Sequence, residues 1–300
     1  MTELNLNTTG SDPEVILSRA HQVILPGSNG HKHPPITRPT GALRIGVDLG
    51  TAYTVLVVLD EDGIPITGEY RFTQFVRDGL VVDYIRGIDI LREMKENLEA
   101  RLGLKLNHAA SGYPPGVPSA EVQASANLVE AAGMNCQTMI PEPLAANKVL
   151  SIHDGIIVDV GGGTTGIAIV KNGEVVYTAD EATGGTHFSL VIAGAEDISF
   201  EKAEELKINP LEQPRLYPIV RPVMEKIGTI IAKHQRGNTV ESIVLVGGTA
   251  LFPGIDTVIQ EVTGLPTRVS GHPLFVTPVG IAMQDHSDLI ESQDLRSFYG

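Results

Sequence analysis

Apolar residues follow two alternating patterns along most of the chain. Short apolar runs bounded by turn residues predict β-strands, and apolar residues three or four positions apart predict helices. The strands are expected at 44–49, 53–59, 107–113, 155–160, 166–170, 174–178 and 242–246. The helices are expected within 87–103, from 119 to 133, at 185–194, 199–207 and about 218–236, and from about 253. Because strands and helices alternate, the pattern predicts an α/β protein.

The first 42 residues differ from the rest. Asp12 and Pro13 suit the N-cap and first position of a short amphipathic helix. Its apolar face would hold Ile16, Leu17, Ala20, Val23 and Ile24. The prolines and glycines of residues 26–41 predict a flexible linker. A helix this short needs a partner surface, so it either packs on its own domain, which we favour, or serves as a docking peptide on a tether.

One segment of the chain is repeated. Residues 45–51, Ile-Gly-Val-Asp-Leu-Gly-Thr, match residues 156–162, Ile-Ile-Val-Asp-Val-Gly-Gly. Each copy is a buried strand ending in aspartate, an apolar residue and glycine, and each continues into a second strand and a hairpin turn. The same unit used twice predicts two similar lobes that face each other. The expected division is an N-terminal extension at 1–42, a first lobe at 43–152 and a second lobe at 153–300.

The two repeated aspartates, Asp48 and Asp159, predict a site for a nucleotide and magnesium. An aspartate at the end of an apolar strand is costly unless its charge is used, and two of them across a cleft would hold Mg²⁺ through its waters. The glycines that follow let the backbone approach phosphate oxygens. Thr51, Thr164 and Thr165 offer hydroxyls to the same oxygens. One Asp-x-Gly alone would indicate a β-turn, but two copies and a third glycine loop at 247–249 favour the site.

The composition narrows the classes of partner and compartment. The net charge is −14, and an acidic surface argues against nucleic acid or an anionic membrane as the main partner. A single cysteine, Cys136, excludes an internal disulfide and fits a reducing cytoplasm. No apolar run approaches the roughly 20 residues of a membrane span, and the N-terminus lacks a signal peptide pattern. We therefore expect a cytoplasmic protein.

The three glycine loops, taken in their order along the chain, resemble the phosphate-1, phosphate-2 and adenosine motifs of one superfamily. That superfamily contains actin, sugar kinases and DnaK-type chaperones. The matching segments are 44–51, 157–165, and 244–249 with 252–254, while 140–146 resembles the connecting helix. The resemblance extends over essentially all of residues 43–285. It implies an actin-like ATPase (ribonuclease H-like) fold, with two related lobes around a nucleotide cleft that takes ATP and Mg²⁺.

The superfamily resemblance also assigns residues to the cleft. It implies catalytic roles for Asp48, Glu142 and Asp159, with Asp48 and Asp159 at the metal and Glu142 facing the metal's waters. The implied nucleotide contacts are Gly50, Thr51, Ala52, Tyr53, Gly161, Gly162, Gly163, Thr164, Thr165, Gly184, Gly185, Glu204, Lys207, Gly247, Gly248 and Thr249. Among these, Glu204 and Lys207 resemble the pair that reaches the ribose.

A narrower resemblance, carried by residues 76–83, 159–171 and 179–185, is to the ethanolamine-utilisation protein EutJ family. It implies an ATP-binding, chaperone-like accessory protein that assists microcompartment assembly or protects and refolds ethanolamine ammonia-lyase. The implied partner is a protein client, either that lyase or the microcompartment shell, and the implied location is the cytoplasm, in association with the microcompartment. We expect a client to contact the lobes, the N-terminal peptide or a further protein, because no peptide-binding domain follows the ATPase fold.

Two departures from the superfamily pattern bear on catalysis. The position after the second threonine of phosphate 2, often an acid, is Gly166 here. The insertion that carries a catalytic lysine in DnaK-type chaperones is missing between residues 71 and 91, and Lys95 is a poor substitute. Hydrolysis needs an oriented water and stabilised charge at the transferred phosphate. We therefore predict a slow ATPase, or no hydrolysis.

Two other functions of the same superfamily stay open. A small-molecule kinase needs a general base, for which Asp83 and Asp89 are the candidates. A bacterial-actin-like filament protein would share the trimmed first lobe and would assemble with ATP.

Overall fold

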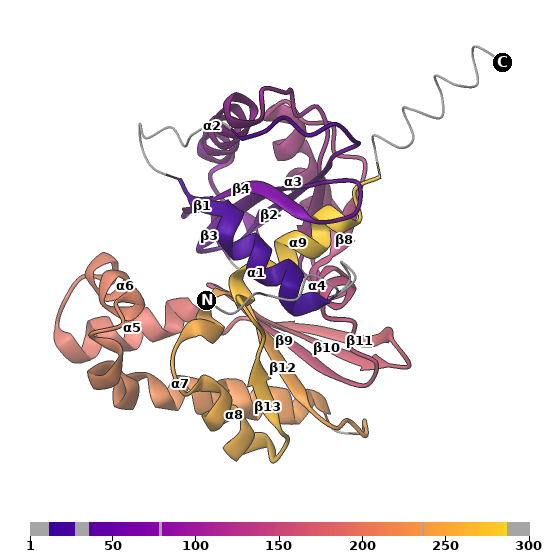
Figure 1. The fold of residues 1–300 in the computed structure, drawn as a ribbon. Coiled ribbons are helices and arrows are strands. Elements are labelled where there is room, and N and C mark those ends of the chain that lie inside the picture. Colours follow the sequence, from indigo (N-terminus) through magenta and orange to yellow (C-terminus); the bar gives the residue numbers. More distant parts are fainter. Residues whose placement is uncertain (1–11, 28–35, 78–79, 236, 287–300) are drawn as a thin grey trace, which may run out of the picture.

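The computed structural model describes residues 12–27, 36–77, 80–235 and 237–286, which form two main β-sheets, one in each half of the molecule (Figure 1). The first sheet has the order β1-β4-β3-β2-β7-β8, and the second has the order β11-β10-β9-β12-β13. Helices lie between the two sheets and on their outer faces. The structure is therefore α/β, as the alternating pattern predicts.

The strands of the first sheet are β1 (Ile24–Pro26), β2 (Arg44–Leu49), β3 (Tyr53–Leu59), β4 (Pro65–Phe72), β7 (Ala110–Tyr113) and β8 (Met139–Pro141). Those of the second are β9 (Gly155–Val160), β10 (Thr165–Lys171), β11 (Glu174–Glu181), β12 (Ile243–Val246) and β13 (Thr267–Val269). A small separate hairpin pairs β5 (Val76–Arg77) with β6 (Leu80–Val81).

The sequence repeat is also a structural repeat. β2 lies antiparallel to β3 with Asp48 opposite Val55, and β9 lies antiparallel to β10 with Asp159 opposite Gly166. Each strand that carries an aspartate also has a parallel neighbour, β7 beside β2 and β12 beside β9. Both aspartates occupy the next-to-last position of their strand. The two sheets are therefore built on the same unit and present these aspartates in equivalent places.

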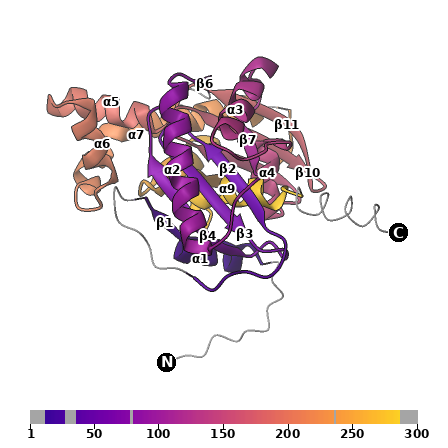
Figure 2. The same cartoon turned by 90° about the horizontal axis from the view of Figure 1, so that it is seen from above.

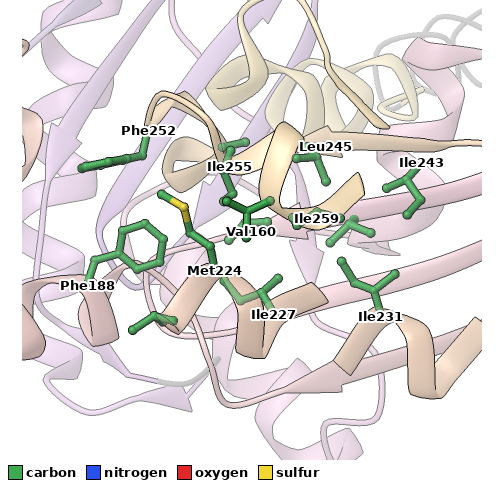
Figure 3. Packing of buried hydrophobic residues seen from close by; sticks show 14 of the residues in the cluster. Val160, Phe188, Met224, Ile227, Ile231, Ile243, Leu245, Phe252, Ile255 and Ile259 are labelled. Carbon is green, nitrogen blue, oxygen red and sulfur yellow. The ribbon is translucent and has the colours of Figure 1, made fainter. Parts of the chain in front are cut away.

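Outer helices cover one face of each sheet. On the first sheet, α2 (Tyr84–Leu102) and α3 (Ser119–Ala131) form this layer, and Leu91 and Met94 of α2 share a buried cluster with β2 and β3 (Figure 2). The second sheet is covered by α5 (Gly185–Glu196), α6 (Phe200–Ile208), α7 (Gln213–Gln235) and α8 (Ile255–Thr263). There Met224 and Ile227 of α7 pack against Leu245 of β12 (Figure 3).

A central layer of helices joins the two sheets. It contains α1 (Pro13–Val23), α4 (Glu142–Leu150) and α9 (Val276–Met283), whose apolar residues share one buried cluster with strands from both sheets (Figure 1). The closest approach is between α4 and α9, where a Cβ added at Gly280 would overlap the backbone carbonyl of Ala145. Burial of apolar surface from both lobes in one cluster makes them one cooperative unit.

The N-terminal segment and α9 differ from the expected division of the chain. Asp12 caps α1, as expected, but the helix is part of the first lobe, because β1 follows it and pairs parallel with β4, Ile24 opposite Gly68. Helix α9, expected in the second lobe, packs against β2 and β3 of the first. Both differences arise from long-range packing that local patterns do not encode. The linker expected at 26–41 lies partly outside the described residues, at 28–35.

Helix α1 also contacts the second lobe directly. Its His21 ring stacks on His272 with 4.1 Å between ring centroids, and Glu14 lies against Gly271. Residues 271–272 follow β13 and lead into a 3-10 helix, η2 (Pro273–Phe275), which continues into α9. The segment therefore spans from β4 to the connection between β13 and α9, which agrees with the favoured interpretation that the helix packs on its own domain.

We expect Gly280→Ala to destabilise the protein by about 1–3 kcal/mol, because the added methyl overlaps the α4 backbone and forces α4 and α9 apart. The matched control is Gly194→Ala, since nothing lies within 4 Å of a Cβ at this helical position in α5. It should gain about 0.5–1 kcal/mol from helix propensity. Urea unfolding of both variants measures the difference, and equal effects would contradict the packing argument.

Candidate functional site

A cavity of about 300 Å³ lies between the two lobes. Its wall includes all three glycine-containing loops predicted from the sequence, together with the start of α4. The predicted site residues on this wall are Asp48, Gly50, Thr51, Ala52, Tyr53, Glu142, Asp159, Gly161, Gly162, Gly163, Thr164, Glu204, Lys207, Gly247, Gly248 and Thr249. The volume is at the lower end of what small-molecule sites show.

Three carboxyl groups gather in this cavity. Asp48 is the next-to-last residue of β2, Asp159 that of β9, and Glu142 is the first residue of α4, so each comes from a different element. Burial and then the charge of Asp159 raise the pKa of Asp48 to about 7. Burial also raises the pKa of Asp159, against which a hydrogen bond from Thr277 acts. Burial and the charges of Asp48 and Asp159 raise the pKa of Glu142 well above its ordinary value.

Such a group of carboxyls suits a divalent cation that keeps its waters. Among the described residues, no set of three or more histidine, cysteine, aspartate or glutamate side chains is arranged to hold a metal directly. Magnesium binds proteins through one or two carboxylates and its own waters and phosphates. A cation would offset the carboxyl repulsion that adds to the effect of burial at Asp48 and Glu142. Asp48 and Asp159 therefore fit the predicted Mg²⁺ site, with Glu142 toward its waters.

The two repeated loops meet across the cavity. A Cβ added at Gly162 would lie 2.6 Å from the Cβ of Ala52, and one at Gly50 would lie 2.6 Å from the carbonyl oxygen of Tyr53. Gly247 has φ +88° and lies against Asp159, where a side chain has no room. These positions need glycine for close approach. The N–H groups of Gly50 and Gly247 donate to the carbonyl oxygens of Tyr53 and Pro273, so they hold the loops in shape.

The loop after β9 is held in place by three further residues that the sequence assigned to the site, Thr249, Gly184 and Gly185. Thr249 Oγ1 donates to the carbonyl oxygen of Gly161 at 2.8 Å, and the N–H of Gly185 donates to the same oxygen at 3.0 Å. Gly184 packs on the carbonyls of Gly161 and Gly162. Gly184 and Gly185 are buried and do not line the cavity, so the structure places them as supports of the loop rather than as contacts to a ligand.

Thr165 differs from its predicted role. The threonine was expected to offer its hydroxyl to phosphate, but it is buried at the start of β10 and its hydroxyl donates to the carbonyl oxygen of Thr183. Because side chains alternate along a strand, Thr164 faces the cavity and Thr165 faces the core.

Glu204 and Lys207 form an ion pair at the cavity wall. Lys207 Nζ lies 2.6 Å from Glu204 Oε1 and also donates to the carbonyl oxygen of Gly185 at 3.1 Å. Burial lowers the pKa of Lys207, although the charge of Glu204 acts in the opposite direction. The pair therefore ties α6 to the start of α5 beside the cavity.

Comparison with known proteins identifies the family. The chain is 40% identical over 241 residues to the ethanolamine utilization protein EutJ of Escherichia coli, covering 80% of this chain and 85% of that protein. The crystal structure of EutJ from Carboxydothermus hydrogenoformans matches with a TM-score of 0.80 and 40% identity, over 90% of this chain and 97% of that one. This chain belongs to the EutJ family.

Two further matches agree with this placement. A family model described as type IV pilus assembly protein PilM matches residues 119–278, more than half of the chain, so the chain also belongs to the group that this model describes. The structure of MreB5 of Spiroplasma citri bound to ADP matches with a TM-score of 0.67 and 19% identity, over 84% of this chain and 98% of that one. The predicted actin-like ATPase fold is confirmed.

The sequence did not point to two residues of this EutJ family member that act on the carboxyl cluster, namely Thr277, which lines the cavity, and Asp180, which lies behind its wall. Thr277, in the first turn of α9, donates its hydroxyl to Asp159 Oδ2 at 2.8 Å. Asp180 of β11 stands opposite Gly166 of β10, and a Cβ at Gly166 would lie 3.8 Å from Asp180 Oδ1. The charge of Asp180 is a further cause of the raised pKa of Glu142. Thr277 gave no local signal, whereas the acidic end of β11 could have been noticed by pairing it with β10.

The candidate bases of a kinase, Asp83 and Asp89, and the candidate lysine, Lys95, lie outside the cavity wall. Asp83 caps α2 by accepting from the N–H of Arg86 at 3.1 Å, and Asp89 pairs with Arg92 on an exposed surface. Lys95 pairs with Glu99 at 2.7 Å within the same helix. None of these residues lines the cavity. In the described part of the chain, no helix is long and apolar enough to cross a membrane.

We expect Asp48→Asn to be more stable than the unsubstituted chain at pH 8, by on the order of 2–4 kcal/mol, without nucleotide or Mg²⁺. The pKa of the Asp48 carboxyl is about 7 in the folded state and about 4 in the unfolded chain. Between these two values the folded chain holds a proton that the unfolded chain has lost, so the stability of the unsubstituted chain falls as the pH rises from 4 to 7. The advantage should shrink to about a third of this by pH 5 and disappear only below about pH 4, the pKa of the unfolded aspartate. Urea unfolding at pH 8 and pH 5, with Asp62→Asn in the exposed hairpin turn as control, measures it, and a pH-independent advantage would contradict the assignment.

Proposed function

We propose that this chain binds ATP with Mg²⁺ in the cavity between its lobes and acts as a chaperone-like accessory protein of ethanolamine utilisation. The observation that carries the nucleotide part is the meeting of two glycine loops around the carboxyls of Asp48, Glu142 and Asp159. Buried carboxyls of raised pKa beside glycine loops that let a ligand approach the backbone suit a metal–phosphate group better than a neutral ligand. The ADP bound to the related MreB5 supports the same interpretation.

We propose further that hydrolysis is slow. Gly166 offers no side chain beside Asp159, and Lys95 is occupied by Glu99 on α2 and does not line the cavity. Binding groups are therefore better represented than groups that stabilise charge at a transferred phosphate. A single-turnover rate in the range of kinases, on the order of 1–100 s⁻¹, would contradict this proposal.

The accessory role is supported by the family. The relatives named above are ethanolamine utilization proteins, and the cavity motifs resemble those of DnaK-type chaperones, which couple nucleotide state to a protein client. The proposed client is ethanolamine ammonia-lyase or the microcompartment shell, met in the cytoplasm at the microcompartment. The kinase alternative is not favoured, because neither Asp83 nor Asp89 lines the cavity.

We expect calorimetry to show that Mg²⁺ strengthens ATP binding by at least about tenfold in the unsubstituted chain, and by much less in Asp48→Asn and Asp159→Asn. Each substitution removes a carboxylate that holds the metal's waters, while it also removes a negative charge that repels the phosphates. In EDTA the two variants should therefore bind ATP as well as the unsubstituted chain, or better.

Asp62→Asn is the matched control for this experiment, because it makes the same chemical change in an exposed hairpin turn. It should retain the full Mg²⁺ effect. Absence of ATP and ADP binding by the unsubstituted chain would contradict the proposed function, and an undiminished Mg²⁺ effect in both site variants would contradict the metal assignment.

We expect the chain with Mg-ATP to increase the fraction of ethanolamine ammonia-lyase activity that survives heating, and Asp159→Asn to lose this effect. The reason is that, in the proposed function, the bound nucleotide sets the arrangement of the two lobes that contact the client. If the lyase gains nothing but shell proteins co-purify with the chain only when Mg-ATP is present, the assembly role is supported instead. Identical results with and without nucleotide for both clients would contradict the accessory role.

A further inference from the structure

The wall of the cavity combines polar and apolar residues. The polar residues include the carboxyls and the glycine loops, and the apolar ones include Ile208 and Leu251. Both of these side chains are 57% exposed although they line a cavity. Large apolar side chains left open at a concave site mark the place where a flat apolar group is covered on binding. Within the proposed function, that group is the nucleotide base.

One amide side chain stands among the described residues of this wall. Gln213 begins α7, five residues after Ile208 ends α6, and it lines the same cavity. Its Nε2 donates to the carbonyl oxygen of Lys207 at 3.0 Å. Carbonyls in the last turn of a helix have no partner within the helix, so this bond satisfies an otherwise open acceptor at the end of α6.

That bond fixes the polarity of the amide. Because the carbonyl of Lys207 can only accept, the nitrogen end of Gln213 must face it, and the oxygen end faces away from it. Turning the amide over would bring two oxygen atoms together and leave the carbonyl unsatisfied. Gln213 therefore presents an acceptor whose orientation is set by the fold.

We propose that Gln213 reads the amino group at position 6 of the purine base and so selects adenine nucleotides. The amino group of adenine donates to Oε1, whereas the oxo group of inosine or guanine at the same position is an acceptor and meets Oε1 oxygen to oxygen. A site built to bond a donor rejects an analogue that lacks it, because the buried acceptor then stays unpaired. This inference rests on the proposed function, since it assigns a residue to the base of the nucleotide bound there.

The competing interpretation is that Gln213 only caps α6. A cap alone would weaken all nucleotides equally when lost, because it acts through the position of Glu204 and Lys207. The ratio of ATP to ITP affinity separates the two interpretations, since ITP differs from ATP only by the oxo group at position 6 and the proton on its neighbouring ring nitrogen. A structural loss common to both nucleotides cancels in this ratio.

The test is calorimetric titration of the full chain with Mg-ATP and with Mg-ITP. We expect the unsubstituted chain to prefer ATP by about tenfold or more, which is the effect of one well-placed hydrogen bond. Gln213→Leu should bring the ratio close to one, because it removes the acceptor. Gln213→Glu should keep a preference for ATP, because it retains an acceptor oxygen while it loses the cap. Gln123→Leu, on the exposed side of α3, is the control and should leave the ratio unchanged.

Each outcome decides between the two interpretations. Equal affinity of the unsubstituted chain for ATP and ITP overturns the inference while leaving the proposed function intact. So does a ratio that Gln213→Leu leaves unchanged, or one that Gln213→Glu abolishes as fully as Gln213→Leu. Failure of both nucleotides to bind the unsubstituted chain contradicts the proposed function itself, which distinguishes the two failures.

Discussion

Contact between the backbones of α4 and α9 is the constraint on which the rest of the structure depends. At their crossing there is no room for a side chain at Gly280 beside the carbonyl of Ala145, so the two helices pack backbone against backbone. Both helices also begin at the cavity: α4 starts with Glu142, and α9 carries Thr277 in its first turn. The crossing therefore sets the separation of the lobes and, at the same time, the position of the groups that face a ligand.

The carboxyl cluster is the energetic counterpart of that close packing. Asp48, Glu142 and Asp159 are brought together near the ends of strands and at a helix start, where burial raises all three pKa values and repulsion raises those of Asp48 and Glu142 further. The hydrogen bond from Thr277 offsets part of this cost at Asp159. A cation bound at this site would remove part of the repulsion, and the free energy released would add to its affinity. The cost of burying these carboxyls together in the empty site thus favours cation binding.

The sequence predicted the elements that depend on local patterns and on the repeat. Strands β2 and β9, their aspartates and the glycine loops are encoded in short segments, and the structure brings them to one cavity. Contacts between distant segments were not predictable in this way. Thr277 lies 118 residues from Asp159, and the bond from Gln213 to Lys207 depends on how α6 and α7 meet. Thr165 shows how precisely a pattern must be placed, because neighbouring residues of a strand face opposite sides. A difference of one position decides whether a threonine hydroxyl faces the cavity or the core.

The segment formed by α1 and β1 connects the two lobes at a place outside the cavity. The segment is tied to the first sheet by the pairing of β1 with β4, and to the loop before η2 by Glu14 and His21. Any rotation of one sheet against the other changes the distance between these two attachments, so the segment cannot stay fully seated at every angle. A change in the angle between the lobes would therefore change the contacts of the N-terminal helix. That change would occur at the molecular surface, outside the cavity, where a protein could bind without touching the ligand.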